Sequence, residues 1–469
     1  MTLARPKSQD FVIVGATGDL AKRKLLPALY NLYTNNLLPE ICEIIGFART
    51  DFDVNAFRQF ARQSIEEHSR TGIDGRLWED FASRLEYVRL RDEGYKVLKD
   101  HCKESERTFY LAVPPDSVPE VVRNIGAYGL SAGARIVVEK PFGIDLKSAQ
   151  KLNAALHEVF TEPQIFRIDH YLGKETVQNI LVFRFANSVF ERVWNREAID
   201  HIQITVAEDI GIEGRGNFYE EVGALRDIVQ NHALQMLALL AMEPPASFAA
   251  EAIRDEKAKL LQAVRPANPR NTVRGQYTAG KTDGEEVPGY RLEPGVAPDS
   301  QTETFVALRL DIANWRWAGV PIYLRTGKHL PKRATEVELA FKEEPIDYLG
   351  GAAFLHSNHL TLHIQPDEGI TFEFLAKEPG PELKAKEVAM DFSYDEAFMV
   401  APAEAYERLI HDVMENDQTL FVREDAVERA WAIVQPLLDQ PPPVTFYPAG
   451  TWGPPEADLL VAPHQWHLR

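Results

Sequence analysis

The feature that most constrains the fold is a short apolar strand that ends in a glycine turn near the start of the sequence. Residues 11–14, Phe-Val-Ile-Val, lead into a turn made of Gly15, Ala16, Thr17, Gly18, Asp19 and Leu20. Apolar residues then recur at helical spacing, at Leu25, Ala28, Leu29 and Leu32. A strand, a glycine turn and a helix in this order open a dinucleotide-binding unit, whose backbone N–H groups face a pyrophosphate. The GxxG pattern is a weak signal alone, because it is shorter than the full GxGxxG fingerprint.

The second apolar strand, residues 43–48, ends at Arg49. An acidic residue near this point accepts a hydrogen bond from the ribose 2′-hydroxyl of NAD, whereas an arginine suits the 2′-phosphate of NADP. Arg49 therefore predicts NADP as the coenzyme. Asp51 and Asp53 follow closely and leave some use of NAD open. The alternative interpretation is an arginine that only begins a solvated loop.

Further strands at 109–115 and 135–138 are separated by helical stretches, and this alternation predicts a parallel sheet with crossover helices. We therefore expect residues 1–168 to form an α/β Rossmann-type domain. Lys140 follows a strand at the sheet edge where ligands bind in such folds, although a lone lysine there is more often a surface residue. Pro27 lies inside the first helical pattern and is expected to kink that helix.

Beyond Glu175 the pattern changes to alternating apolar and polar residues, which is typical of strands with one buried face. Such stretches occur at 202–208, 306–312, 336–341, 360–365 and 370–374. Residues 169–469 are therefore expected to form a larger α+β domain with a predominantly antiparallel sheet and helices on one face. The other face would be open to water or to another subunit. Residues 264–300 are expected to be a surface excursion without regular structure, and the proline-rich residues 440–469 to lie on the surface.

The segment 167–175, Arg-Ile-Asp-His-Tyr-Leu-Gly-Lys-Glu, carries the first candidate site. If it is helical, His170 and Lys174 project from one face and form a plausible seat for a phosphate monoester. Asp169 could orient a histidine, as a carboxylate does beside a general base. The alternative is a solvated helix with an internal ion pair.

The segment 222–242 carries the second candidate site and is expected to be a helix. His232 falls on its apolar stripe, where a histidine is usually a core residue with its hydrogen bonds satisfied. Asp227 lies five positions earlier, about 140° away on an ideal helix, so the two side chains would bracket a pocket. Glu208 extends the covered face of a strand and is expected either to pair with a basic neighbour or to face a ligand.

A basic loop follows another strand and contains Lys328, Lys332 and Arg333. Without further context this loop would be a solvated surface. The net charge of −19 over 469 residues argues against nucleic acid or an anionic membrane as a partner. An anionic substrate must therefore be held by a local group of basic side chains.

Cys42 and Cys102 are too few for a disulfide framework or a structural zinc site. No HExxH, Cys/His quartet or EF-hand loop occurs, and we expect no metal ligands. The N-terminal residues lack a secretory apolar stretch, and the apolar runs are too short to span a membrane. These observations predict a cytoplasmic protein.

Five segments in order, GATGDL, EKPFG, RIDHYLGKE, DIVQNH and RTGKHL, resemble the glucose-6-phosphate dehydrogenase family over nearly the whole sequence. The resemblance implies oxidation of glucose 6-phosphate at C1 to 6-phosphogluconolactone with NADP, the entry step of the oxidative pentose phosphate pathway. It also implies a homodimer or homotetramer, and a proline at 141 that is typically cis.

The resemblance also implies a role for each candidate residue. His232 is the expected general base and Asp169 its orienting carboxylate. The expected substrate-binding residues are His170, Tyr171, Lys174, Glu208, Asp227, Lys328, Arg333 and Lys140. The expected coenzyme-binding residues are those of the 15–20 turn together with Lys24, Arg49 and Lys140. Some relatives carry lysine at the position of Arg333.

The chemistry needs a base, because hydride transfer from a sugar hydroxyl leaves a proton, and histidine titrates near neutral pH. Two other interpretations remain: another two-domain NAD(P)-dependent sugar oxidoreductase, or a catalytically silent sensor of NADP and sugar phosphate. The basic residues suited to a phosphate disfavour the first. The presence of both His232 and Asp169 disfavours the second.

Overall fold

The computed structural model describes residues 5–91, 93–282, 284–346, 357–398 and 404–468. Its contacts divide the chain into two compact units. The first unit comprises Met1–Lys174, Pro245–Asp255 and Pro402–Glu428, and the second Glu175–Pro244, Glu256–Ala401 and Arg429–Arg469. Among the described residues, none of the helices combines the length and the apolar character that crossing a membrane requires.

The first unit is built on a seven-stranded sheet with the order β17-β6-β5-β4-β1-β2-β3. Its strands are β1 (Asp10–Val14), β2 (Ile44–Ala48), β3 (Leu85–Arg89), β4 (Arg107–Leu111), β5 (Ala134–Val138), β6 (Ile165–Ile168) and β17 (Phe421–Val422). All neighbours are parallel except β17, which is antiparallel to β6. The order 3-2-1-4-5-6 is that of doubly wound dinucleotide-binding folds. The Rossmann-type prediction is confirmed.

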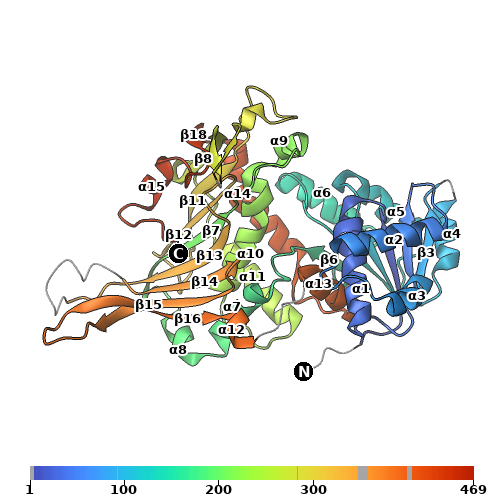
Figure 1. Cartoon of the computed structure of the whole chain (residues 1–469), viewed down its shortest axis with the longest axis horizontal. Helices are drawn as coiled ribbons and strands as arrows, with labels where there is room; N and C mark the ends of the chain where they lie inside the picture. Colours follow the sequence, from blue (N-terminus) through green and yellow to red (C-terminus); the bar gives the residue numbers. More distant parts are fainter. Residues whose placement is uncertain (1–4, 92, 283, 347–356, 399–403, 469) are drawn as a thin grey trace. The chain divides into compact units, whose positions relative to one another are not determined.

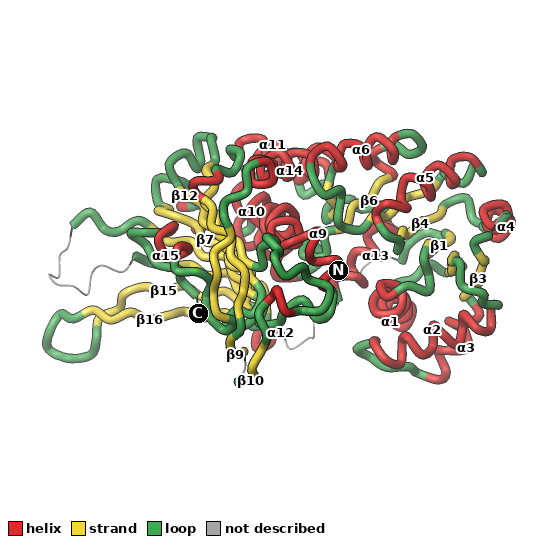
Figure 2. The backbone as a smooth tube through the Cα atoms, turned by 90° about the horizontal axis from the view of Figure 1, so that it is seen from above, coloured by secondary structure: helices red, strands yellow, loops and turns green. Residues whose placement is uncertain are grey.

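Helices cover both faces of this sheet, as the view from above shows (Figure 2). They are α1 (Leu26–Thr34), α2 (Val54–His68), α3 (Gly75–Ser83), α4 (Gly94–His101), α5 (Val118–Ala127), α6 (Leu146–His157) and α13 (Ala405–Glu415). Three short helices complete the unit: η1 (Ala21–Leu25), η2 (Pro115–Ser117) and η3 (Glu162–Gln164). Both faces of the strands are thus covered, which explains their continuous apolar sequences.

The expected kink at Pro27 has a specific form. Residues Ala21–Leu25 form a π-helical turn, and α1 begins at Leu26 with Pro27 in its first turn. The helix is continuous through this junction, and Pro27 has no N–H to donate to the preceding turn. The proline therefore marks the change from π- to α-helical winding.

The second unit contains a nine-stranded sheet with the order β16-β15-β14-β13-β7-β12-β11-β8-β18 (Figure 1). Its strands are β7 (Ile199–Ala207), β8 (Thr272–Thr278), β11 (Phe305–Asp311), β12 (Pro321–Gly327), β13 (Ala334–Phe341), β14 (His359–Gln365), β15 (Gly369–Lys377), β16 (Ala385–Ser393) and β18 (Val444–Pro448). Only β12 with β7 and β18 with β8 pair in parallel within the described part of this sheet. The predominantly antiparallel α+β prediction is confirmed.

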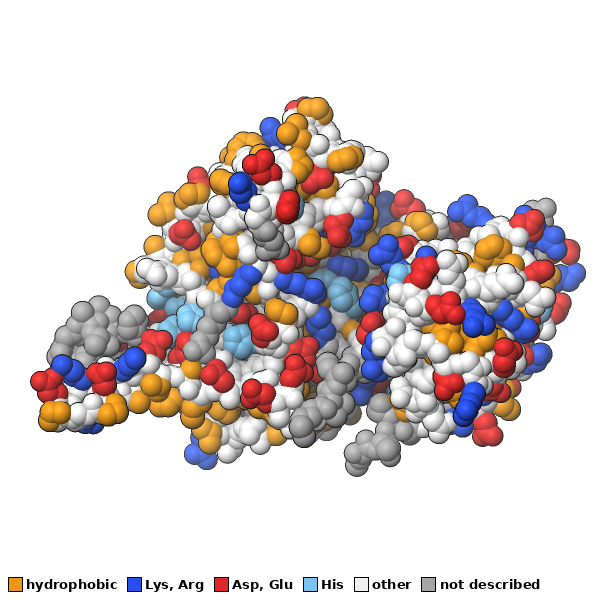
Figure 3. Space-filling model, in the orientation of Figure 1, with side chains coloured by type: hydrophobic (Ala, Val, Ile, Leu, Met, Phe, Trp, Pro, Cys, Tyr) orange, Lys and Arg blue, Asp and Glu red, His pale blue; other side chains and the backbone are white. Residues whose placement is uncertain are grey.

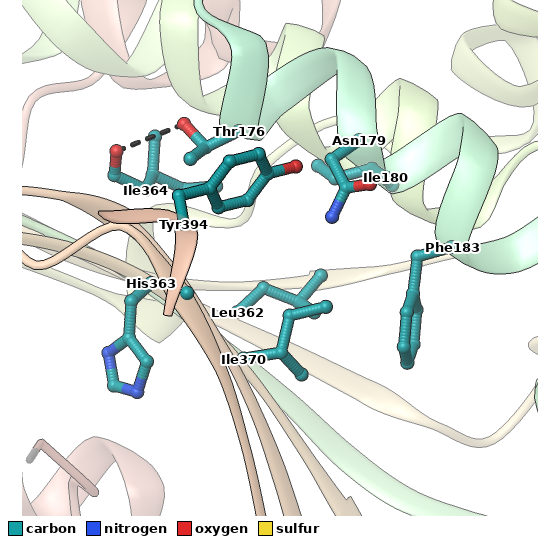
Figure 4. A pocket seen from close by; sticks show the side chains of 10 residues that line it. Thr176, Asn179, Ile180, Phe183, Leu362, His363, Ile364, Ile370 and Tyr394 are labelled. Carbon is teal, nitrogen blue, oxygen red and sulfur yellow. Dashed lines mark hydrogen bonds between the residues drawn. The ribbon is translucent and has the colours of Figure 1, made fainter. Parts of the chain in front are cut away.

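The helices of this unit are α7 (Glu175–Phe185), α8 (Ser188–Val193), α9 (Gly216–Ala224), η4 (Leu225–Ala233), α10 (Leu234–Ala241), η5 (Pro269–Asn271), η6 (Tyr290–Leu292), α12 (Tyr394–Phe398) and α15 (Glu456–Val461). Two more, α11 (Ala250–Ala263) and α14 (Glu424–Asp439), contain residues of both units. Helix η4 packs against β7 and β12. Helix α7 lies on β14 and β15, where Thr176 donates a 3.0 Å hydrogen bond to the carbonyl of Ile364 and Phe183 lies beside Ile370 (Figure 4).

Two segments differ from what was expected of them: residues 264–300 were expected to have no regular structure, and residues 440–469 to lie on the surface. Residues 264–300 contain β8, the short strands β9 (Gly280–Thr282) and β10 (Glu285–Val287), and the buried Tyr277 and Tyr290. Residues 440–469 contain β18 and α15, with Tyr447 fully buried. The first expectation was wrong, and the second holds for only part of its segment. Prolines and charges at the ends of short strands concealed the apolar side chains between them.

The polar face of the second sheet was expected to be open to water or to another subunit. Part of it is covered by the C-terminal residues 462–468. Gln203 on β7 donates to the carbonyl of Gln465 at 2.8 Å and accepts from the N–H of His467 at 2.9 Å. Trp466 stacks on the buried guanidinium of Arg325, 4.5 Å from its ring centre.

Candidate active site

The glycine turn after β1 has the geometry of a dinucleotide-binding turn. Gly15 has a φ of +90°, and a Cβ atom there would lie 2.2 Å from the carbonyl oxygen of Ala112. Only glycine fits this close approach, since it has no side chain and adopts positive φ without strain. The N–H of Gly18 bonds to the carbonyl of Gly15 at 3.0 Å, which closes the turn before the helix begins.

The tip of β2 carries Arg49, whose side chain is exposed. Next to it, the hydroxyls of Thr50 and Thr17 share a 2.8 Å hydrogen bond that joins this tip to the glycine turn. Asp51, the first acidic residue after Arg49 in the sequence, forms an ion pair with Arg89 at the end of β3. The structure therefore places two arginines and one already paired acid at this edge.

Three other predicted coenzyme residues lie on or beside the turn. Ala16 is buried, Leu20 is partly exposed, and Asp19 accepts a 2.8 Å hydrogen bond from Arg23. Lys24 lies in η1 and pairs with Glu404 at 3.2 Å, so it is already engaged within this unit.

Lys140 follows β5, and the Lys140–Pro141 peptide bond is cis. The preceding Glu139 accepts hydrogen bonds from the hydroxyls of Tyr110 and Tyr406. Burial raises the pKa of Glu139 to about 7, and the negative charge of Asp169 also raises it, against the lowering effect of the two hydroxyls and Lys140. A carboxyl group that titrates near neutral pH therefore stands next to two predicted site residues.

The segment at 169–174 is a turn after β6 and not a helix, so the predicted helical spacing of His170 and Lys174 was wrong. The turn nevertheless brings both side chains to Tyr171. The His170 ring lies 5.2 Å from the Tyr171 ring, and the Lys174 ammonium 5.4 Å from the same ring. Asp169 is buried and accepts a 3.0 Å hydrogen bond from the N–H of Tyr171, which fixes its carboxylate at the start of the turn.

The segment 222–242 is helical but not uniformly α-helical. Gly223, with φ 60° and ψ 174°, breaks α9, and residues Leu225–Ala233 form the π-helix η4 before α10 begins. The carboxylate of Glu303 accepts from the N–H of Leu225 at 3.2 Å and is itself held by Arg274 at 2.7 Å. Glu303 thus caps the start of η4.

The π-helical winding corrects the expected angle between Asp227 and His232. In a π-helix each N–H bonds to the carbonyl five residues earlier, so residues five apart lie roughly one turn apart. Asp227 and His232 therefore belong to nearly the same side of η4, not to sides 140° apart. His232 is 1% exposed, and Asp227 is partly exposed.

The buried ammonium of Lys328 lies among acidic and aromatic side chains of the second unit. Its Nζ is 2.6 Å from Glu208 Oε2 and 3.8 Å from Asp227 Oδ2. The ring centre of Tyr219 is 5.5 Å from the same nitrogen. Glu208 therefore pairs with a basic neighbour, one of the two expected arrangements, and three predicted substrate residues come together.

The backbone on both sides of this cluster is fixed. The hydroxyl of Tyr447 donates to the carbonyl of Lys328 at 2.7 Å, and the N–H of Lys328 donates to Thr304 at 2.9 Å. Arg333 is exposed on the loop before β13, where it lines a pocket with Lys332 and Asp367. No contact joins it to Lys328 among the interactions that the structure gives for the described residues.

Sequence reasoning missed Tyr219. The tyrosine is 4% exposed, its hydroxyl has no hydrogen-bond partner among the described residues, and its ring faces the Lys328 ammonium. Burial and the carboxylates of Asp227 and Glu208 hold its pKa well above the usual range, so it stays a neutral hydroxyl. No motif marked it, because α9 meets Lys328 only through the tertiary fold.

The doubly wound sheet, the glycine turn and the lysine–carboxylate cluster define a two-domain, dinucleotide-dependent sugar oxidoreductase. Two family models cover the chain: "Glucose-6-phosphate dehydrogenase, NAD binding domain" matches residues 12–179, and "Glucose-6-phosphate dehydrogenase, C-terminal domain" matches residues 181–468. The chain belongs to the glucose-6-phosphate dehydrogenase family.

Individual relatives match over nearly their whole length. Glucose-6-phosphate 1-dehydrogenase of Rhizobium meliloti (strain 1021) is 47% identical over 96% of both chains, and that of Aggregatibacter actinomycetemcomitans is 48% identical over 96% of this chain and 95% of its own. A solved glucose-6-phosphate dehydrogenase in complex with its substrate glucose 6-phosphate superposes with a TM-score of 0.91 at 35% identity, covering 100% of both chains.

Proposed function

We propose that this enzyme oxidises glucose 6-phosphate at C1 to 6-phosphogluconolactone with NADP as the coenzyme. The observation that carries the proposal is the turn at 169–174, which brings an imidazole and an ammonium to one tyrosine ring directly after a buried carboxylate. Family membership supports the same reaction. We also propose that residues 1–168 form the coenzyme domain and residues 169–469 the substrate and oligomerisation domain.

The coenzyme fits the residues present in the first unit. The close approach at Gly15 leaves no room for a Cβ, as expected for a turn whose backbone contacts a pyrophosphate. We assign the turn from Gly15 to Leu20, with Lys24 and Lys140, to coenzyme binding. Arg49 is assigned to the 2′-phosphate of NADP, because its exposed guanidinium and the paired state of Asp51 both favour an added negative charge.

Substrate binding is assigned to residues of two kinds. His170, Tyr171 and Lys174 hold the phosphate, since an ammonium and an imidazole offer charge-assisted hydrogen bonds to its oxygens. Glu208 and Asp227 accept from sugar hydroxyls, and Lys328 donates to the same sugar. Arg333 and Lys140 are assigned as further substrate contacts.

NADP supplies the hydride acceptor in this reaction. The hydroxyl proton at C1 goes to His232, whose buried imidazole is the general base of the proposal. Asp169 fixes the tautomer of the imidazole and stabilises the imidazolium that forms. The N–H of Tyr171 supports this role by holding one oxygen of Asp169 in place.

The experiment is a turnover assay with purified protein, NADP and glucose 6-phosphate, followed by the absorbance of reduced nicotinamide. We expect turnover that requires both compounds and is far slower with free glucose. Binding of both compounds without reduction would instead identify a silent sensor. Equal rates with free glucose would favour a different sugar oxidoreductase.

We further propose a homodimer or homotetramer in the cytoplasm. The large apolar side chains of Leu383, Met390 and Phe398, on or beside β16 at the sheet edge, are more than half exposed, which suits a contact with a second copy. Cys42 and Cys102 are both free, as a reducing compartment requires. Light scattering of the purified chain tests the assembly, and a monomer would contradict it.

A further inference from the structure

A group of ionisable side chains lies on the polar face of the larger sheet, within the second unit. Glu338 on β13, His359 on β14 and His467 near the C-terminus each offer one ligand atom, and these atoms lie within 4.8 Å of one another. The two imidazole rings are stacked, with centres 4.8 Å apart and 6° between their planes. Histidine side chains gather near the end of the chain in the space-filling view (Figure 3).

Both histidines direct the same nitrogen toward the carboxylate. His359 Nδ1 contacts Glu338 Oε1, and His467 Nδ1 lies 4.0 Å from that oxygen. His359 Nε2 forms a 3.0 Å hydrogen bond with Ser357 Oγ, whereas His467 Nε2 lies 3.3 Å from Glu373 Oε2 without hydrogen-bond geometry. Histidines that bind metals are arranged in this way, with one nitrogen on the metal and the other held by a hydroxyl or carboxylate.

The carboxylate at the centre is buried and only partly satisfied. The Glu338 side chain is 3% exposed, and its Oε2 has no hydrogen-bond partner among the described residues. Thr361 lies opposite Glu338 on the neighbouring strand β14. Its buried hydroxyl also has no hydrogen-bond partner in the described part of the chain. Buried polar atoms of this kind indicate an additional group, since leaving them unpaired costs free energy.

The local charge favours a cation. Glu373, with a 7% exposed side chain, adds a second carboxylate beside His467. The buried guanidinium of Arg325 lies on the same face and interacts electrostatically with Glu338. It also interacts with Asp458 and Glu336, so its charge is shared among three carboxylates. A divalent ion held by the two imidazoles would balance the charge of these two carboxylates.

We propose that Glu338, His359 and His467 bind a divalent first-row transition metal of the Zn²⁺ type, with Glu373 orienting His467. Imidazole nitrogen and carboxylate oxygen are suitable ligands for this ion. The metal joins β13 and β14 to the C-terminal residues 462–468 and so holds that segment on the sheet. No metal ligands were expected from the sequence, because positions 338, 359 and 467 follow no motif spacing.

The chain offers a matched control on the same strand. His363 Nδ1 lies 3.3 Å from Glu336 Oε1, and its Nε2 lies 3.1 Å from the hydroxyl of Thr371. This pair repeats the histidine–glutamate contact across β14 and β13 without a third ligand side chain in the described residues. His363→Asn therefore changes a comparable side chain and leaves the proposed site complete.

The test is calorimetric titration of Zn²⁺ into the full chain after treatment with a chelator. The proteins are the wild type, Glu338→Gln, His359→Asn, His467→Asn and His363→Asn. We expect the wild type and His363→Asn to bind Zn²⁺ at this site with similar affinity. The other three variants should bind Zn²⁺ there about 100-fold more weakly or worse. Zn²⁺ should raise the Tm of the first two proteins by more than that of the other three.

Equilibrium dialysis separates this site from other clusters of suitable ligand atoms, such as Asp200, His201 and His464. The expected difference between the wild type and His467→Asn is one ion per chain. His467 lies outside the strands, so its substitution leaves the sheet residues in place even where His359→Asn fails to fold. Equal zinc uptake by the wild type and His467→Asn, or no uptake by the wild type, overturns the proposal.

Discussion

Lys328 Nζ lies 2.6 Å from Glu208 Oε2 in a position where the lysine is almost fully buried. Asp227 lies 3.8 Å from the same nitrogen, so one ammonium compensates two carboxylates. Removing one member of a buried pair leaves a desolvated charge, whereas removing both members avoids that cost. The three side chains are therefore coupled energetically, besides forming part of the proposed substrate site.

We predict that Lys328→Met and Glu208→Gln each lower the free energy of unfolding, and that the double variant loses less than the sum. The coupling should be about 1–3 kcal/mol, as found for residues in direct contact. Urea unfolding of the four proteins without substrate measures it. Additive losses would mean that the ion pair is screened by solvent, since the Glu208 side chain is 27% exposed.

Arg49→Ala tests the coenzyme assignment. The charge-assisted contact with a 2′-phosphate is worth about 1.5–3 kcal/mol, so we expect NADP to be preferred over NAD by roughly tenfold or more in the wild type. The substitution should remove most of that preference and leave turnover with NAD nearly unchanged. The readout is kcat/KM with each coenzyme. Arg76→Ala, at an exposed arginine of α3, is the control, and an equal loss with both coenzymes would refute the role of Arg49.

Lys174→Ala tests the phosphate assignment. The KM for glucose 6-phosphate should rise strongly, because the variant loses a cation that stands beside the Tyr171 ring. Slow turnover of free glucose should hardly change, since that sugar has no phosphate to hold. Lys147→Ala, at an exposed lysine of α6, serves as the control. A loss by the same factor with both sugars would assign the lysine another role.

Glu139 predicts a specific pH dependence of stability. Its folded pKa of about 7 lies above the unfolded value of 4.5, so between these values the folded state holds a proton that the unfolded state has released. The contribution of Glu139 to the free energy of unfolding is fully present below about pH 4.5 and is lost as the pH rises through about 7. The loss is at most about 3 kcal/mol, because the residue keeps some solvent exposure.

Glu139→Gln should remove the part of the slope of unfolding free energy against pH that comes from the proton on Glu139. The measurement is urea unfolding at several pH values between about 5 and 8, compared with Glu66→Gln on the exposed side of α2, which makes the same change in net charge. If Glu139→Gln and the wild type have the same slope, the carboxyl group of Glu139 is already ionised across this range.

The Rossmann-type sheet could be predicted from local pattern because β1, β2, β4 and β5 each contain an uninterrupted apolar run and alternate with helices. The strand β3 was missed, since its burial alternates and it carries charged residues at positions 86 and 89. The second sheet was predicted only where the alternation was clear. Strands β8 and β18 pair in parallel across more than 160 residues, a relationship that no local pattern contains.

The site residues also divide into those that could be predicted from the sequence and those that could not. Lys328, Glu208 and Asp227 were selected from their segments and their family resemblance, and the fold brings them together. Tyr219 and Glu303 were not selected, because their importance comes from contacts with Lys328 and Leu225 that only the folded chain makes. The π-helical winding of η4 was also missed, since its apolar positions suit an α-helix equally well.

His232→Asn is the sharpest test, because a fully buried histidine on a helix is most often a core residue. If His232 is a core residue, the variant protein should be less stable, and its activity should fall only in proportion to the unfolded fraction. A general base would instead leave a folded variant that binds NADP and glucose 6-phosphate nearly normally while kcat falls by roughly 10²–10⁴.

Asp169→Asn should lose much of the same factor in kcat, and the double variant little more, because a base and its orienting carboxylate act as a unit. The measurements are a thermal melt, a ligand titration and a turnover assay on the same three preparations. Losses in kcat that multiply in the double variant would show that the two residues act independently. A normal kcat in a well-folded His232→Asn protein would exclude His232 as the base, whatever Asp169→Asn does.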